Sequence, residues 1–127
     1  MPIRFILDPK HELLLLTTAE GLVTFEEILK HIDMEAGEIL LRHRELFDAR
    51  TATTNLTADQ VRQIVARLHT VMHSGLFGPV AVVTTDDVFF GMARMMGMFS
   101  EARNGPQVAA FRTYDEALDW LVNTSPQ

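Results

Sequence analysis

The sequence predicts a single α/β domain over residues 1–127, built on a mixed, mostly parallel sheet of five strands with four helices. Short runs of β-branched and other apolar residues alternate with longer segments whose apolar residues recur at helical spacing. This alternation is typical of parallel strands joined by right-handed helical crossovers. The length of 127 residues fits one domain, and no linker, internal repeat or low-complexity segment divides the chain. The predicted order is therefore β-β-α-β-α-β-α-β-α.

The first three predicted strands lie in the N-terminal half. Residues 3–7 form a short apolar run, and Pro9 follows it in a turn, because the proline ring presets a turn value of φ. Residues 12–18 are almost continuously apolar, as expected for a strand that is covered on both faces. A third strand is expected at 45–49, and the polar segment 50–55 after it is expected to be a loop.

The four helices are predicted from their N-terminal signals and their apolar stripes. Three of them begin at the spacing of a capping box, in which a threonine and a side chain three residues later bond each other's backbone N–H groups: Thr24 with Glu27, Thr57 with Gln60, and Thr113 with Glu116. The third helix instead follows Asp86 and Asp87, whose carboxylates are expected to cap its free N–H groups. The helices are expected over about 25–41, from Thr57 to before Gly75, over about 87–103 and over 114–121, with the last two strands at 80–84 and 108–112.

Composition and charge exclude several classes of function. The chain has 11 basic and 17 acidic residues, a net charge of −6, so nucleic acid is a poor partner, because phosphate binding needs clustered Lys and Arg. Cysteine is absent, which excludes disulfides and thiolate metal sites and suits a reducing cytoplasm. No signal peptide and no apolar run near the ~20 residues of a membrane span is found. We therefore expect a cytoplasmic protein without a membrane span.

No motif for nucleophilic catalysis or for phosphate binding by a glycine-rich loop is present, and no cofactor is predicted. His69 and His73 lie one helical turn apart, but zinc requires a third and usually a fourth ligand, and the other histidines are scattered over other elements. No metal site is therefore predicted. An enzyme that uses Asp86, Asp87 or this histidine pair is the least supported alternative, because no two of these groups can be placed in a required geometry.

The third predicted helix is apolar over more of its circumference than one packed face requires. The residues expected to form an interface or an apolar ligand site are Phe89, Phe90, Met92, Met95, Met96, Met98 and Phe99. Methionine suits tolerant binding surfaces, and obligate dimer interfaces resemble a core cut in half. The first hypothesis is a homodimer or other protein partner held by this helix. The alternative is an apolar small molecule or lipid beneath it, with Arg50 or Arg94 holding an anionic headgroup.

Several segments together resemble the STAS superfamily of sulfate transporter and anti-sigma-factor antagonist domains, and most of all its small stand-alone branch, often described as STAS- or CRAL-TRIO-like. The resemblance covers nearly the whole chain and rests on residues 20–24, 46–50, 80–83, 90–95, 111–112 and 116–121 in this order and spacing. It implies a STAS-like fold and a non-catalytic binding or regulatory role. It names no substrate.

The resemblance also raises the question of a phosphorylation switch. In anti-sigma-factor antagonists a phosphorylatable serine precedes the second helix, within an Asp-Ser-Ser-Gly type of motif. Here the segment after Asp48 contains no serine and no such glycine. Thr53 and Thr54 are the hydroxyl residues that would have to stand in as phosphoacceptors.

Overall fold

The computed structural model describes residues 3–10, 14–37, 43–71 and 78–124. This part of the chain contains five strands, β1 (Ile3–Leu7), β2 (Leu14–Val23), β3 (Arg44–Thr54), β4 (Val80–Val83) and β5 (Val108–Phe111). Its four helices are α1 (Phe25–Gly37), α2 (Ala58–Val71), α3 (Asp87–Ala102) and α4 (Tyr114–Asn123). The predicted order of elements is confirmed. The expected strand start at 12 and helix end at 41 lie outside the described residues.

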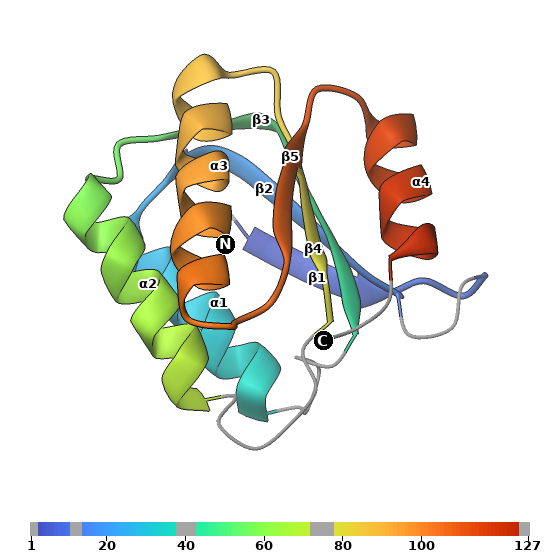
Figure 1. The fold of residues 1–127 in the computed structure, drawn as a ribbon. Helices are drawn as coiled ribbons and strands as arrows, with labels where there is room; N and C mark the ends of the chain where they lie inside the picture. Colours follow the sequence, from blue (N-terminus) through green and yellow to red (C-terminus); the bar gives the residue numbers. More distant parts are fainter. Residues whose placement is uncertain (1–2, 11–13, 38–42, 72–77, 125–127) are drawn as a thin grey trace.

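The five strands lie in the sheet in the order in which they occur in the sequence, β1-β2-β3-β4-β5. β1 pairs with β2 antiparallel, and each later pair is parallel. Because right-handed crossovers between sequential parallel strands all pass over one face, α1, α2 and α3 form a layer on that face. The C-terminal helix α4 covers the opposite face (Figure 1). The mixed, mostly parallel α/β sheet is thus confirmed.

The sheet separates two apolar cores, because successive strand side chains point to opposite faces. On the face of α1, α2 and α3, Phe47 and Val82 pack with side chains such as Ile64 and Phe89. On the other face, Leu46 packs with Leu121 of α4 and with further residues of β2 and β4. None of the helices in the described residues is long and apolar enough to cross a membrane.

The third strand is longer than predicted. Residues 50–54, expected as a loop, continue β3, because β2 also extends to Val23 and offers them a partner. The register shifts between Thr18 and Glu20, and Gly21 next to this shift adopts φ of +69°, a conformation that favours glycine. The loop prediction was wrong because Thr and Asn are typical of turns, while threonine also fits a pleated strand.

The predicted helix starts at Thr24, Thr57 and Thr113 are confirmed. In each, the backbone N–H of the third residue into the helix donates to the capping threonine hydroxyl, at 3.1 to 3.3 Å. The Thr24 and Thr57 N–H groups also donate to the side chain three residues later, whereas at Thr113 the hydroxyl donates to Glu116.

At α3, Asp86 is the N-cap and its carboxylate accepts from the Phe89 N–H at 2.9 Å. Asp87 was expected to cap as well. Its side chain instead points to solvent, where it pairs with the Arg112 guanidinium at 2.9 Å.

Candidate functional site

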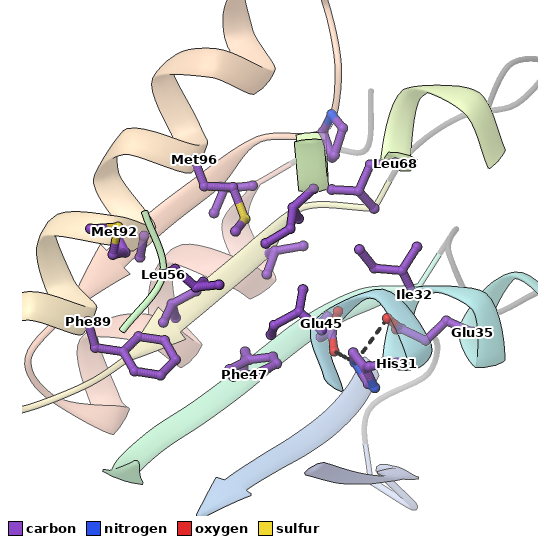
Figure 2. Close-up of a pocket in the computed structure, with 18 of the residues that line it drawn as sticks. His31, Ile32, Glu35, Glu45, Phe47, Leu56, Leu68, Phe89, Met92 and Met96 are labelled. Atoms are coloured by element: carbon purple, nitrogen blue, oxygen red, sulfur yellow. Dashed lines mark hydrogen bonds and ion pairs between the residues drawn. The ribbon is translucent and has the colours of Figure 1, made fainter. Parts of the chain in front are cut away.

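A cavity of about 90 Å³ lies between the sheet and the layer of α1, α2 and α3. Strands β3, β4 and β5 form its floor, and the three helices contribute the remaining walls (Figure 2). Its lining is mostly apolar, with side chains such as Ile32 from α1, Leu68 from α2 and Met92 and Met96 from α3. No lysine or arginine is among the described residues that line it. The described part of the cavity wall is therefore mainly apolar, and its ionisable side chains are histidine and glutamate.

Three ionisable side chains meet at one end of this cavity: His31 and Glu35 from α1 and Glu45 from β3. We call them the polar cluster. The His31 Nε2 atom lies 2.9 Å from Glu45 Oε2 and 3.0 Å from Glu35 Oε1, and both carboxyl groups point toward the ring in Figure 2. The three side chains are only 6, 4 and 9% exposed. Thr17 of β2 donates its hydroxyl to Glu45 Oε2 at 2.5 Å.

The local folding of α1 and β3 brings the polar cluster together. His31 and Glu35 are four residues apart, so they share one face of α1, and this face also carries the buried Ile28 and Ile32. Glu45 lies two residues before Phe47 in β3, so both side chains point to the same face of the sheet.

Aromatic side chains hold the imidazole of the polar cluster in place. The ring of His31 meets the Phe5 ring at 5.7 Å and the Phe47 ring at 5.9 Å, both in edge-on arrangements. The orientation of His31 is therefore fixed by apolar packing as well as by its two carboxyl partners.

Burial and mutual interaction set the protonation of the polar cluster. Burial raises the pKa of Glu35, and the charge of Glu45 raises it further, to about 8. Burial alone would lower the pKa of His31, but the charges and hydrogen bonds of Glu45 and Glu35 outweigh burial and raise this pKa to about 10. Burial would raise the pKa of Glu45 too, yet the charge of His31 and hydrogen bonds from His31 and Thr17 outweigh it and lower this pKa. The directions of these pKa shifts favour a protonated His31, a protonated Glu35 and an ionised Glu45, an arrangement in which the cluster carries no net charge.

A fourth polar residue, His43, lines the same cavity. It lies two residues before Glu45, and its Nδ1 atom is buried without a hydrogen-bond partner among the described residues. Buried polar atoms are almost always paired, so this atom has bonding capacity to offer to a molecule in the cavity. Burying the polar cluster in an apolar core also costs free energy, which points to a role other than stability.

The apolar residues of α3 that were predicted to form an interface or a ligand site lie in different surroundings. Phe89, Met92 and Met96 line the cavity, while Met95 and Phe99 pack half-buried at the edge of the core. Phe90 lies under the guanidinium of Arg112, 4.0 Å from the ring centroid, and Phe99 lies near that of Arg62 at 4.9 Å. Met98 is the one of the set that is mostly exposed, at 62%. Most of the surplus apolar surface of α3 is thus covered by the chain itself.

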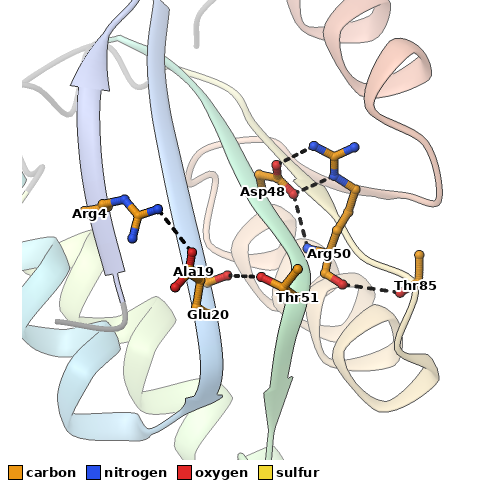
Figure 3. Close-up of polar contacts among 7 residues, drawn as sticks. All are labelled: Arg4, Ala19, Glu20, Asp48, Arg50, Thr51 and Thr85. Atoms are coloured by element: carbon orange, nitrogen blue, oxygen red, sulfur yellow. Dashed lines mark hydrogen bonds and ion pairs between the residues drawn. The ribbon is translucent and has the colours of Figure 1, made fainter.

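The two arginines predicted to hold an anionic headgroup do not line the cavity. The Arg50 guanidinium bonds both carboxylate oxygens of Asp48 (Figure 3). It also lies 5.1 Å from the ring centroid of Tyr114 in α4. Burial alone would raise the pKa of Asp48, but the hydrogen bonds from Arg50 outweigh burial and lower it. Arg94 is exposed on α3. The structure therefore does not bring either arginine to the apolar site.

The two candidate phosphoacceptors lie within β3. Thr54 is buried, and its hydroxyl donates to the Val23 carbonyl oxygen at 2.9 Å. Thr53 is exposed and pairs with Leu22 of β2 in the sheet. Only Thr53 of the two is accessible to a kinase in the folded state.

The polar cluster was not predicted from the sequence, in which His31 is one of several scattered histidines and Glu35 and Glu45 belong to no recognised motif. The sequence nevertheless contains one indication of the polar cluster. His31 and Glu35 interrupt the apolar stripe of α1 at positions that fall beside Ile28 and Ile32. His69 of the histidine pair is exposed and does not line the cavity, and His73 lies outside the described residues.

Comparison with known proteins supports the fold. No protein-family model matches the sequence, and no curated protein matches it significantly. The chain is similar to an uncharacterised protein of the DUF3478 family with a SpoIIAA-like fold from Shewanella loihica, with a TM-score of 0.61 and 18% identity over 94% of this chain and 93% of that one. A second similar structure is the anti-sigma factor antagonist SpoIIAA in its unphosphorylated form, with a TM-score of 0.48 and 13% identity over 95% of this chain and all of that one. The first likeness shows the fold alone: the chain has a SpoIIAA-like, and hence STAS-like, fold, as predicted.

Proposed function

We propose that this STAS-like domain is a non-catalytic binding module whose cavity takes a small, mostly apolar molecule with one polar group. The observation that carries the proposal is an apolar cavity that ends in a buried polar cluster. Ligand sites of small molecules are typically apolar with a few polar groups that fix orientation. The polar cluster supplies such groups at one end, and His43 Nδ1, which has no hydrogen-bond partner among the described residues, supplies another.

The volume of the cavity limits the size of this ligand. At about 90 Å³ it is smaller than an engineered cavity of about 150 Å³ that binds benzene. A ligand of one ring therefore requires small movements of the walls, whereas a long acyl chain requires much larger ones. The methionines of α3 are the side chains best able to adapt, because they are unbranched and flexible. A monocyclic molecule is therefore favoured over the lipid considered from the sequence.

Binding is tested with toluene and 4-methylphenol as probes and with amide chemical shifts as the readout. Both probes should shift the signals of cavity residues such as Leu68 and Met96, and the phenol should also shift those of the polar cluster. Ala93→Leu fills the cavity from α3 and should abolish the shifts, whereas Ala102→Leu at the exposed end of the same helix should retain them. Absence of shifts in the wild type, or shifts that persist in Ala93→Leu, would argue against the proposal.

A homodimer held by α3 is a second proposal, favoured by the apolar residues that this helix leaves exposed. Val88 is 53% and Met98 62% exposed. A stable interface buries about 800 Å² per partner, so neighbouring elements would have to take part. Light scattering should give twice the 14.3 kDa of one chain, and Met98→Glu should lower that mass. A monomer at high protein concentration would exclude this interface.

A further inference from the structure

We propose that the polar cluster is a binding site for one divalent transition-metal ion, with an open coordination position that faces the cavity. The donors are one imidazole nitrogen and two carboxylate oxygens, a set that suits Zn²⁺, Mn²⁺ or Fe²⁺. His31, Glu35 and Glu45 each offer one ligand atom, and all these atoms lie within 4.8 Å of one another. Such a site goes beyond the proposed function, because an ion can bind here whether or not an apolar molecule fills the cavity.

The spacing of the donors fits an ion of this size. Zinc lies about 2.0 to 2.2 Å from imidazole nitrogen and carboxylate oxygen, so tetrahedral geometry separates two donors by roughly 3.3 Å. The His31 Nε2 atom is 2.9 and 3.0 Å from its two carboxyl partners. Movements of a few tenths of an ångström would therefore bring each carboxyl oxygen to the spacing from His31 that an ion requires, and all three ligand atoms already lie within 4.8 Å of one another.

The groups around the donors are those that orient ligands in metal sites. Thr17 donates its hydroxyl to Glu45 Oε2 and fixes the rotation of this carboxylate. The rings of Phe5 and Phe47 hold the imidazole edge-on. Two ligands come from one face of α1 and the third from a central strand, so regular secondary structure fixes all three.

Charge and coordination number point to an open site. Two carboxylates balance the charge of a divalent ion, so the buried site as a whole is neutral. Three protein ligands leave a fourth position for water or another molecule, as in zinc sites that bind substrates. His43 also lines this cavity, and its buried Nδ1 atom has no hydrogen-bond partner among the described residues, so it can bond a polar group of a molecule held there. It would bond the molecule in the fourth position.

The test uses the full chain after treatment with a chelator, titrated with Zn²⁺ and Mn²⁺ by calorimetry. We expect one ion per chain. Glu35→Gln keeps the size of the side chain and removes a ligand, and should weaken binding at least 100-fold. Thr17→Val removes only an orienting hydrogen bond and should weaken binding about 10-fold. The control His69→Asn, at an exposed histidine of α2, should bind as the wild type does. Circular dichroism checks that each variant is folded.

A second measurement locates the bound ion in the wild-type protein and does not depend on whether a variant folds. Paramagnetic Mn²⁺ at low occupancy should broaden the amide signals of His31, Glu35 and Glu45 before those of the rest of the chain. The proposal fails if the folded wild type binds no ion, if Glu35→Gln binds as tightly, if His69→Asn loses binding, or if broadening centres elsewhere. Toluene binding without metal is a separate result, so failure of this site leaves the proposed function standing.

Discussion

The two glycines inside α3 should respond in opposite directions to the same substitution by alanine. Gly91 is exposed, and a Cβ atom added there would have no neighbour within 4 Å. Gly97 faces β5, and a Cβ atom added there would overlap the backbone carbonyl oxygen of Val108. Alanine therefore fits at Gly91 and collides with the sheet at Gly97.

The expected changes in the free energy of unfolding follow from helix propensity at both positions and from the steric overlap at Gly97. Alanine stabilises a helix interior by up to about 1 kcal/mol relative to glycine, and Gly91→Ala should gain this amount. At Gly97 the same gain is opposed by overpacking, which costs about 1–3 kcal/mol or more, since backbone and not a flexible side chain stands in the way. Gly97→Ala should therefore lose up to about 2 kcal/mol, and the two variants should differ by the overpacking cost, roughly 1–3 kcal/mol.

Urea unfolding followed by circular dichroism measures both free energies, and thermal unfolding should separate the two variants by about 10 °C. An unchanged slope with urea would show that the substitutions alter stability alone. If Gly97→Ala were as stable as Gly91→Ala, α3 would not approach β5 at this point. The wall of the cavity formed by Met92 and Met96 would then lie elsewhere, and an apolar ligand would not be expected at this place.

Three further predictions concern the cap of α3 and the polar cluster. In urea unfolding, Asp86→Ala should lower the free energy of unfolding by about 1 kcal/mol, and Asp87→Ala should lower it by less. Equal losses would contradict the assignment of Asp86 as the N-cap. Joint replacement of the polar cluster by His31→Phe, Glu35→Met and Glu45→Met should leave stability unchanged or raise it by about 1–4 kcal/mol, because buried ion networks seldom add net stability. A loss above about 2 kcal/mol would mean that the cluster serves folding. In chelator-treated protein the pKa values of Glu35 and His31, raised to about 8 and about 10, mean that the folded state holds protons that the unfolded state releases. The free energy of unfolding should then be highest near pH 5 and fall by at least about 3 kcal/mol between pH 6 and pH 9. Denaturant titrations at several pH values measure it, and a flat profile would contradict the pKa shifts.

The elements that the sequence predicted correctly are those with local causes. The pairing of Thr113 with Glu116 and the cap at Asp86 depend on residues three positions apart, so they can be read from the chain. The extension of β3 through 50–54 has a non-local cause, because these residues become a strand only when the end of β2 lies beside them. A threonine-rich segment is compatible with both a turn and a strand, and pairing decides between them.

The polar cluster joins a helix and a strand, and a second strand orients one of its carboxylates, an arrangement that no single segment of sequence provides. Thr17, His31 and Glu45 come from β2, α1 and β3, and their contacts span 14 and 28 residues of chain. What could have been predicted is the burial of His31 and Glu35, since both lie within the apolar stripe of α1. A polar residue in an apolar stripe is a stronger functional signal than an apolar surplus, because the surplus can be covered internally, as on α3.

The two ends of the cavity differ in stiffness, and this difference decides how the site can select a ligand. The polar cluster is fixed by hydrogen bonds between a helix and two strands, so it presents its polar groups in one arrangement. Met92 and Met96 on the opposing helix have flexible side chains that adapt to different apolar shapes. A polar group that is left unpaired in the bound complex costs about 1–3 kcal/mol of binding free energy. A methyl group added to or removed from the part of the ligand that packs against a methionine costs about 1 kcal/mol or less. Selection should therefore follow the polar group of the ligand, or the metal that it meets, more than the outline of its apolar part.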